Sequence, residues 1–124
     1  MFQNILLVGL GGFVGSVLRY GTGRLAQRLF DTPLPWGTFA VNILGSFIIG
    51  IVLALFEKNM IIDNNLKLLI AVGFCGGFTT FSSFAFENLT ALQSGQFLTA
   101  ALYTAGSLLF GLLAVYVGFS IIKA

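Results

Sequence analysis

Four long stretches without a single Asp, Glu, Lys or Arg constrain this chain more than any other feature of its sequence. They cover residues 1–18, 32–56, 68–86 and 88–122. A helix needs about twenty apolar residues to cross the hydrocarbon core of a bilayer, and each stretch comes close to that length or exceeds it. The pattern predicts an all-α membrane protein with four transmembrane helices, at about residues 3–22, 35–56, 66–93 and 97–121.

Composition supports this class, because 57% of the 124 residues are hydrophobic and only 8% are charged. A soluble fold of this length would leave a large apolar surface in water. The connections are short, so residues 1–124 are expected to form a single transmembrane domain.

A net charge of +2 without a basic run argues against a nucleic-acid partner. One cysteine and no histidine exclude a disulfide scaffold and a His or Cys metal site.

The residues between the first and second apolar stretches indicate how the two predicted helices end and begin. Cations follow the first apolar stretch rather than precede it, so this stretch is expected to be a transmembrane helix and not a secretory signal. Pro33 and Pro35 predict an extended turn into the second helix, and Trp36 suits the headgroup interface.

Lysine and arginine are balanced across the predicted topology. Four spans place three cations on each face: Lys58, Lys67 and Lys123 on one, and Arg19, Arg24 and Arg28 on the other. Orientation follows a Lys and Arg imbalance, which is missing here. We therefore expect insertion in both orientations, and two copies made in this way can meet as an antiparallel homodimer. The alternative is that a weak bias in the order of the charges still selects one orientation.

The second span carries a polar stripe made of Thr38, Asn42 and Ser46, spaced one helical turn apart. An Asn amide within a membrane needs hydrogen-bond partners. Asn42 can tie two helices together, or it can present an N–H donor to a passing anion. Physical considerations favour the first interpretation over the second.

The third span has paired glycines, Gly76 and Gly77, followed by the hydroxyl residues Thr79, Thr80, Ser82 and Ser83. This composition predicts that the helix unwinds at the glycines. Freed carbonyls at membrane depth can bind a cation, and without a nearby carboxylate an alkali ion would suit them. Close helix packing is the alternative, because Gly73 and Gly77 are four residues apart. Packing is the preferred interpretation for the similar pair Gly11 and Gly15.

Phe81 and Phe84 follow this segment at a spacing of three residues, among hydroxyl side chains. The positive edges of their rings, together with hydroxyl donors, could cradle a small anion. Tyr103 and Ser107 add a second hydroxyl stripe on the fourth span. The alternative is that each Ser or Thr only bonds back to the carbonyl four residues earlier.

Titratable groups are expected to be shallow, since Arg19 ends the first span and Glu87 lies in the far half of the third. Without an embedded relay, passive conduction fits better than proton-coupled pumping. A small multidrug antiporter would need a carboxylate in the first span, which has none. A non-transporting scaffold is a second rival. An enzyme is not expected, because no nucleophile–base pair or carboxylate pair stands out.

Three stretches, residues 11–20, 36–45 and 73–84, resemble the Fluc (CrcB) family of bacterial fluoride channels, and the resemblance extends over essentially the whole chain. The specific match is Gly-Gly-x-Thr-Thr-Phe-Ser at residues 76–82 in the third of four spans. The resemblance implies a multi-pass protein of the bacterial inner membrane that lets toxic cytoplasmic fluoride leave passively. It also implies a dual-topology antiparallel homodimer with two pores and a central sodium ion that is structural and not transported.

The resemblance further implies a role for each matching residue. Main-chain carbonyls of Gly76 and Thr79 from both copies would hold the sodium ion. Phe81 and Phe84 would form an aromatic box that lines the pore, and Asn42 would supply the amide that meets fluoride. Tyr103 and Ser107 would form a hydroxyl track on the fourth span. We also assign Thr38 and Ser83 to the pore. Arg19 would lie near the aqueous vestibule. Family members can carry another hydroxyl one turn after Ser107, where this chain has Gly111.

Overall fold

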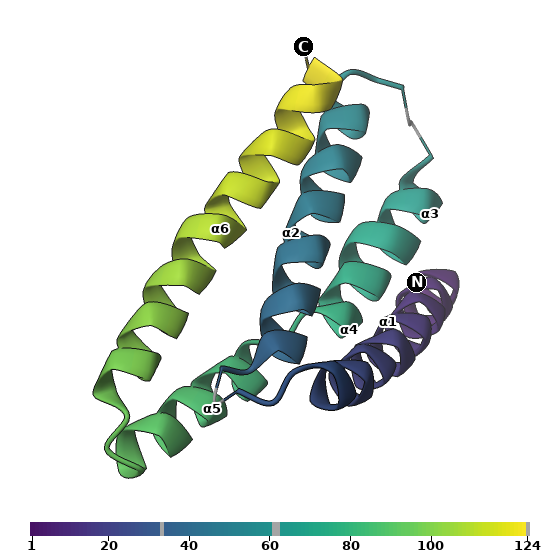
Figure 1. Cartoon of the computed structure of the whole chain (residues 1–124). Coiled ribbons are helices and arrows are strands. Elements are labelled where there is room, and N and C mark those ends of the chain that lie inside the picture. The colour runs from purple at the N-terminus through teal and green to yellow at the C-terminus, as the bar shows by residue number, and fades with distance from the viewer. Residues whose placement is uncertain (33, 61–62, 124) are drawn as a thin grey trace.

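The computed structural model describes residues 1–32, 34–60 and 63–123, and it is helical almost throughout (Figure 1). Its elements are α1 (Phe2–Leu29), α2 (Trp36–Glu57), α3 (Asn64–Lys67), the π-helix η1 (Leu68–Cys75), α4 (Gly76–Phe78), α5 (Phe81–Gln93) and α6 (Phe97–Lys123). Within these described ranges, four segments are long and apolar enough to span a membrane: α1, α2, the composite segment Asn64–Gln93, which we call the third segment, and α6. The predicted all-α class with four such helices is confirmed.

Helix boundaries differ from expectation mainly in α1, which continues to Leu29 instead of ending near residue 22. Arginine is a good helix former, so Arg24 and Arg28 extend the helix although they were expected to lie beyond it. The helix stops where Phe30 adopts an extended backbone. Pro35 directly precedes α2, and Trp36 begins it. Pro33, on which the predicted turn also depended, lies outside the described residues.

Small residues hold the bundle together. α2 packs against α6 on one side and against α1 and η1 on the other, and α1 also contacts α4 (Figure 1). Most of the buried apolar side chains are small or medium in size: Val41, Val52, Ala54, Ala71, Cys75 and Ala100. Large apolar side chains such as Phe13, Leu109 and Leu112 face outward instead. This distribution fits a protein whose surroundings are lipid.

Glycines bring the backbones of α1 and the third segment into contact. A Cβ added to Gly11 would clash with the carbonyl of Leu69, and one added to Gly15 would clash with the carbonyl of Phe74. The packing interpretation of this pair is therefore confirmed. Gly77 shares the interface, since its Cβ would lie 2.6 Å from the Gly12 carbonyl oxygen.

The third segment is interrupted at Thr79 and Thr80, which we call the break. Both residues have extended backbones, with ψ of 158° and 122°, and helical geometry resumes at Phe81. The predicted unwinding at Gly76 and Gly77 is wrong in position, because these two glycines are helical.

Threonine hydroxyls bond on both sides of the interruption. The N–H and Oγ1 of Thr79 both donate to the Cys75 carbonyl, at 3.0 and 2.7 Å, in the last helical turn before the break. Oγ1 of Thr80 accepts from the N–H of Ser83 at 3.2 Å and so caps α5. The glycines remain helical, and Gly77 packs against α1.

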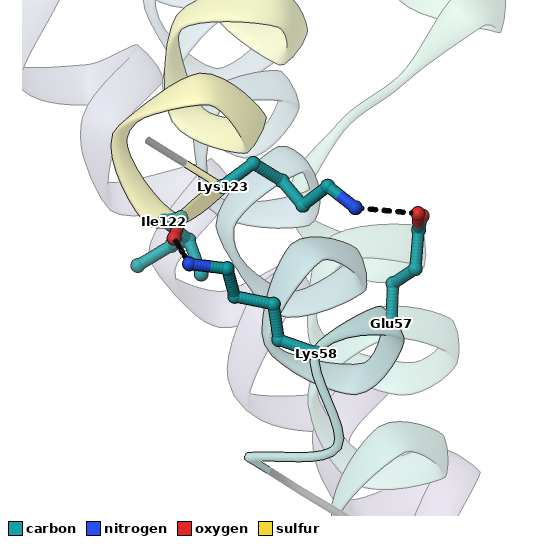
Figure 2. A network of polar contacts seen from close by, with 4 residues as sticks. All are labelled: Glu57, Lys58, Ile122 and Lys123. Carbon is teal, nitrogen blue, oxygen red and sulfur yellow. Dashed lines mark hydrogen bonds and ion pairs between the residues drawn. The ribbon is translucent and has the colours of Figure 1, made fainter.

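Lys58 and Lys123 lie at one end of the bundle, where α2 and α6 end (Figure 2). Nζ of Lys123 lies 2.8 Å from Oε1 of Glu57, and Lys58 donates to the Ile122 carbonyl. Lys67 lies over the ring of Phe56, 5.1 Å from its centroid. Arg24 lines a cavity together with Gly37, at the opposite end of α2.

Candidate functional site

Asn42 of α2 forms two hydrogen bonds with the backbone of the break. Its Nδ2 donates to the Thr80 carbonyl at 3.2 Å, and its Oδ1 accepts from the Thr80 N–H at 2.8 Å. In a continuous α-helix this N–H would donate to the carbonyl of Gly76. The amide of Asn42 thus replaces a lost helical hydrogen bond. The structure bears out the first of the two interpretations of Asn42, a tie between helices.

Arg19 of α1 stabilises the same segment from the other side. Its Nε donates to the Gly77 carbonyl at 3.0 Å, and this carbonyl would accept from Phe81 in a continuous helix. Arg19 also lines a cavity of about 190 Å³ with Thr38, Thr80 and Ser83. The residue expected beside an aqueous vestibule therefore hydrogen-bonds to α4, two residues before the break.

Glu87 connects α2, α5 and α6. Its Oε2 accepts from Oγ1 of Thr38 at 2.7 Å, and its Oε1 accepts from the hydroxyl of Tyr103 at 2.9 Å. Thr38 and Tyr103 were both predicted to line a pore, whereas Glu87 was expected only to be shallow. A signal was available in the sequence: Glu87 is three residues after Phe84, which places the two side chains on one face of a helix.

Three aromatic rings follow one another beside this carboxylate. The centroids of Phe81 and Phe84 are 5.7 Å apart, and those of Phe84 and Tyr103 are 5.1 Å apart. Tyr103 is buried, Phe84 is half-buried, and Phe81 is 78% exposed. The predicted aromatic pair is thus brought together, and its outer member projects away from this single copy of the chain.

A cavity of about 420 Å³, which we call the main cavity, lies beside the break. Residues from α2, the third segment and α6 line it, among them Asn42, Ser46, Gly76, Thr79, Phe81, Phe84, Ser107 and Gly111. Oγ of Ser107 is buried there and has no hydrogen-bond partner among residues 1–32, 34–60 and 63–123. The predicted cation ligands and four of the predicted pore residues therefore share one cavity.

The other three predicted pore residues lie elsewhere. Thr38 and Ser83 line the smaller cavity with Arg19. Tyr103 lines a separate cavity of about 250 Å³ with Glu87. The hydroxyl stripe of α6 is therefore divided, since Tyr103 bonds to Glu87 whereas Ser107 borders the main cavity.

The main cavity suits a cation only through backbone oxygens. No group of three or more His, Cys, Asp and Glu side chains that could hold a metal occurs in the described part of the chain. Gly76 and Thr79 line the cavity, and the N–H that would occupy the Gly76 carbonyl in a helix is bound to Asn42 instead. Carbonyl oxygens are the ligands that hard cations prefer. The residues present fit a sodium ion held by main-chain carbonyls.

Comparison with known proteins adds an independent finding. Residues 6–119 match a family model described as "CrcB-like protein, Camphor Resistance (CrcB)". A protein of Gloeothece citriformis is 49% identical over 120 residues, which cover 97% of each chain. One from Thermus thermophilus is 46% identical over 117 residues, covering 94% of this chain and 93% of the relative. Another, from Azobacteroides pseudotrichonymphae, is 44% identical over 119 residues, covering 96% and 95%. Each of the three is named "Fluoride-specific ion channel FluC".

Proposed function

This chain belongs to the CrcB-like family, and on that premise we propose that it is a passive, fluoride-selective channel. It is a multi-pass membrane protein, since four of its described helices are long and apolar enough to span a bilayer. Its relatives are named as ion channels, which confirms the expectation that it is not an enzyme. The resemblance to the fluoride channel family is likewise confirmed.

The observation that carries the proposal is the buried hydroxyl of Ser107 at the main cavity. A buried donor without a partner is costly, and a small anion in the cavity would supply the missing acceptor. Asn42 adds a side-chain amide with two N–H donors, and one of these donors is bonded to the Thr80 carbonyl. Ring edges of Phe81 and Phe84 complete a lining that contains no carboxylate. Fluoride is compact and accepts strong hydrogen bonds, so this lining favours it.

Beyond the main cavity an anion meets the hydroxyls of Thr38 and Tyr103. Both donate to Glu87, so fluoride would compete with this carboxylate for the same two donors. Like charges repel strongly where water is scarce, so the carboxylate must withdraw as the anion arrives. Glu87 would therefore limit passage to an anion that binds the hydroxyls as strongly as a carboxylate does. Arg19, beside Thr38 in the smaller cavity, would attract anions to this point.

We place two such pores in an antiparallel homodimer. Cations are balanced, with three lysines at one end of the bundle and three arginines in the second half of α1. Phe81 is largely exposed at the margin of the main cavity, where a second, oppositely oriented copy would cover it. Each copy would then contribute residues to both pores.

A structural sodium ion fits this dimer. The main-chain carbonyls of Gly76 and Thr79 from both copies would hold it, and Asn42 and Arg19 would keep those residues in place through the Thr80 and Gly77 backbones. When bound, the ion supplies positive charge that offsets the facing carbonyl dipoles and favours a nearby anion. The ion would not be transported.

In the cell, the channel would act in the bacterial inner membrane. Fluoride enters as its neutral acid and dissociates in the more alkaline cytoplasm, so a passive channel suffices for its exit. No carboxylate is present in α1, where a small multidrug antiporter would need one. This absence favours a passive channel over proton-coupled exchange.

Purified protein in liposomes, with a fluoride electrode outside, tests the proposal. Potassium-driven fluoride release should appear with the wild type and should collapse for Phe81→Ile and Asn42→Asp. Phe13→Ile is a matched control, because Phe13 is a similarly exposed aromatic residue on α1 that does not line the main cavity. Absence of release from the wild type would favour a non-transporting scaffold. Undiminished release from both site variants would contradict the site assignment.

A further inference from the structure

The polar stripes of α2 and α6 face each other turn by turn. Thr38 and Tyr103 donate to the same carboxylate, Glu87. One turn further along, Asn42 and Ser107 line the main cavity. After another turn the cavity is lined by Ser46 on α2 and by Gly111 on α6. At this third level only α2 carries a polar side chain.

Ser46 lies close to the space that a side chain at Gly111 would occupy. A Cβ added to Gly111 would be 4.0 Å from Oγ of Ser46, and Ser46 is the nearest neighbour that this Cβ would meet. Hydroxyls on these two residues would therefore border the same part of the cavity. The contact distance also leaves room for a small side chain at position 111.

The hydroxyl of Ser46 is available to a ligand. Thr22, Thr79 and Thr90 each donate to the carbonyl four residues earlier, at 2.9, 2.7 and 3.0 Å. No side-chain hydrogen bond of Ser46 occurs among residues 1–32, 34–60 and 63–123, and Ser46 is half-buried. The nearby Ser107 hydroxyl is likewise without a described partner. Two unpartnered hydroxyls on facing helices thus border one cavity.

We propose that Ser46 supplies the third hydrogen-bond donor of the pore, at the level where α6 has Gly111. This inference rests on the proposed channel function and adds to it a residue that determines how well the cavity holds a small anion. The donors contacted in turn are then Ser107 and Asn42, followed by Ser46. A serine at 46 together with glycine at 111 places one hydroxyl where the two helices face each other.

The test moves the hydroxyl from one helix to the other. Fluoride release from liposomes is measured for the wild type, Ser46→Ala, and two double variants that combine Ser46→Ala with Gly111→Ser or with Gly111→Ala. We expect Ser46→Ala to release fluoride about tenfold more slowly, as for the loss of a hydrogen bond to a charged group. Adding Gly111→Ser should restore the rate to within about twofold of the wild type, whereas Gly111→Ala should not.

Controls separate this result from a folding defect and from failure of the channel function. Ser120→Ala removes an α6 hydroxyl that does not line the main cavity, and it should behave as the wild type does. If Ser46→Ala elutes abnormally from a sizing column, Ser46→Cys replaces it, and its slower release carries the same meaning. Wild-type rates for the Ser46 variant, or equal recovery with Gly111→Ala, would overturn the inference while the channel function stands. No release from the wild type would overturn both.

Discussion

The side chain of Asn42 and the backbone of Thr80 hydrogen-bond to each other in both directions, at 3.2 and 2.8 Å. This pairing lets a transmembrane helix stop and restart without leaving the Thr80 backbone groups unpaired in the membrane. It also leaves the Gly76 carbonyl without its usual helical donor at the margin of the main cavity. One side chain therefore stabilises the break and helps to shape the cavity beside it.

Asn42→Asp should both destabilise the protein and stop conduction. The substitution retains the acceptor for the Thr80 N–H, but it replaces the donor with a charged oxygen that faces the Thr80 carbonyl. We expect a loss of about 1–3 kcal/mol in the free energy of unfolding, measured by denaturation in detergent. Asn88→Asp is the matched control, since Asn88 bonds to the Phe84 carbonyl and the Thr104 hydroxyl but does not itself line the main cavity. It should lose stability and still conduct; equal conduction by both variants would contradict the role of Asn42.

Gly15→Ala should disrupt the interface between α1 and the third segment. Its Cβ would clash with the Phe74 carbonyl and approach the Phe78 backbone nitrogen at 2.8 Å. Overpacking of this kind typically costs about 1–3 kcal/mol, which a lower thermal unfolding temperature would reveal. Gly9→Ala on the same helix is the control, because its Cβ would meet nothing within 4 Å. Similar melting temperatures for the two variants would show that the close approach at Gly15 does not matter for stability.

Tyr103→Phe removes one of the two hydrogen bonds to Glu87 and leaves the ring in place. A hydrogen bond to a charged group contributes about 1.5–3 kcal/mol, so both stability and fluoride release should fall. Tyr116→Phe removes an exposed hydroxyl from the same helix and should change neither quantity. Wild-type release from Tyr103→Phe would exclude the Tyr103 hydroxyl from the conduction path.

Chemical labelling tests the orientation of the chain in the membrane. Met60→Cys, combined with Cys75→Ser, provides one exposed thiol beside the lysine-rich end of the bundle. Asn59 is less suitable because its φ is positive. A membrane-impermeant reagent applied to cells should label roughly half of the protein, because the cation balance gives no orientation preference. Complete labelling, or none, would mean a single orientation and would contradict the antiparallel dimer.

Sequence patterns anticipated the four apolar helices, because a charge-free apolar stretch of about twenty residues is typical of a transmembrane helix. They also anticipated the packing of Gly11 and Gly15, where the four-residue spacing determines the contact. The break was misplaced because composition favoured the glycines, whereas the extended residues are Thr79 and Thr80, and the Thr80 hydroxyl caps the helix that follows. The contacts of Glu87 were not anticipated because its partners, Thr38 and Tyr103, come from two other helices. Such contacts depend on how helices pack and not on local spacing.

Currents across a planar bilayer test the central claim most directly. The reconstituted protein is placed between solutions with a fluoride gradient, and the reversal potential is measured with and without an added chloride or pH gradient. We expect a current whose reversal potential follows the fluoride gradient and does not move when either of the other gradients is imposed. A reversal potential that follows chloride or pH, or the absence of any current, would contradict passive fluoride conduction by this protein.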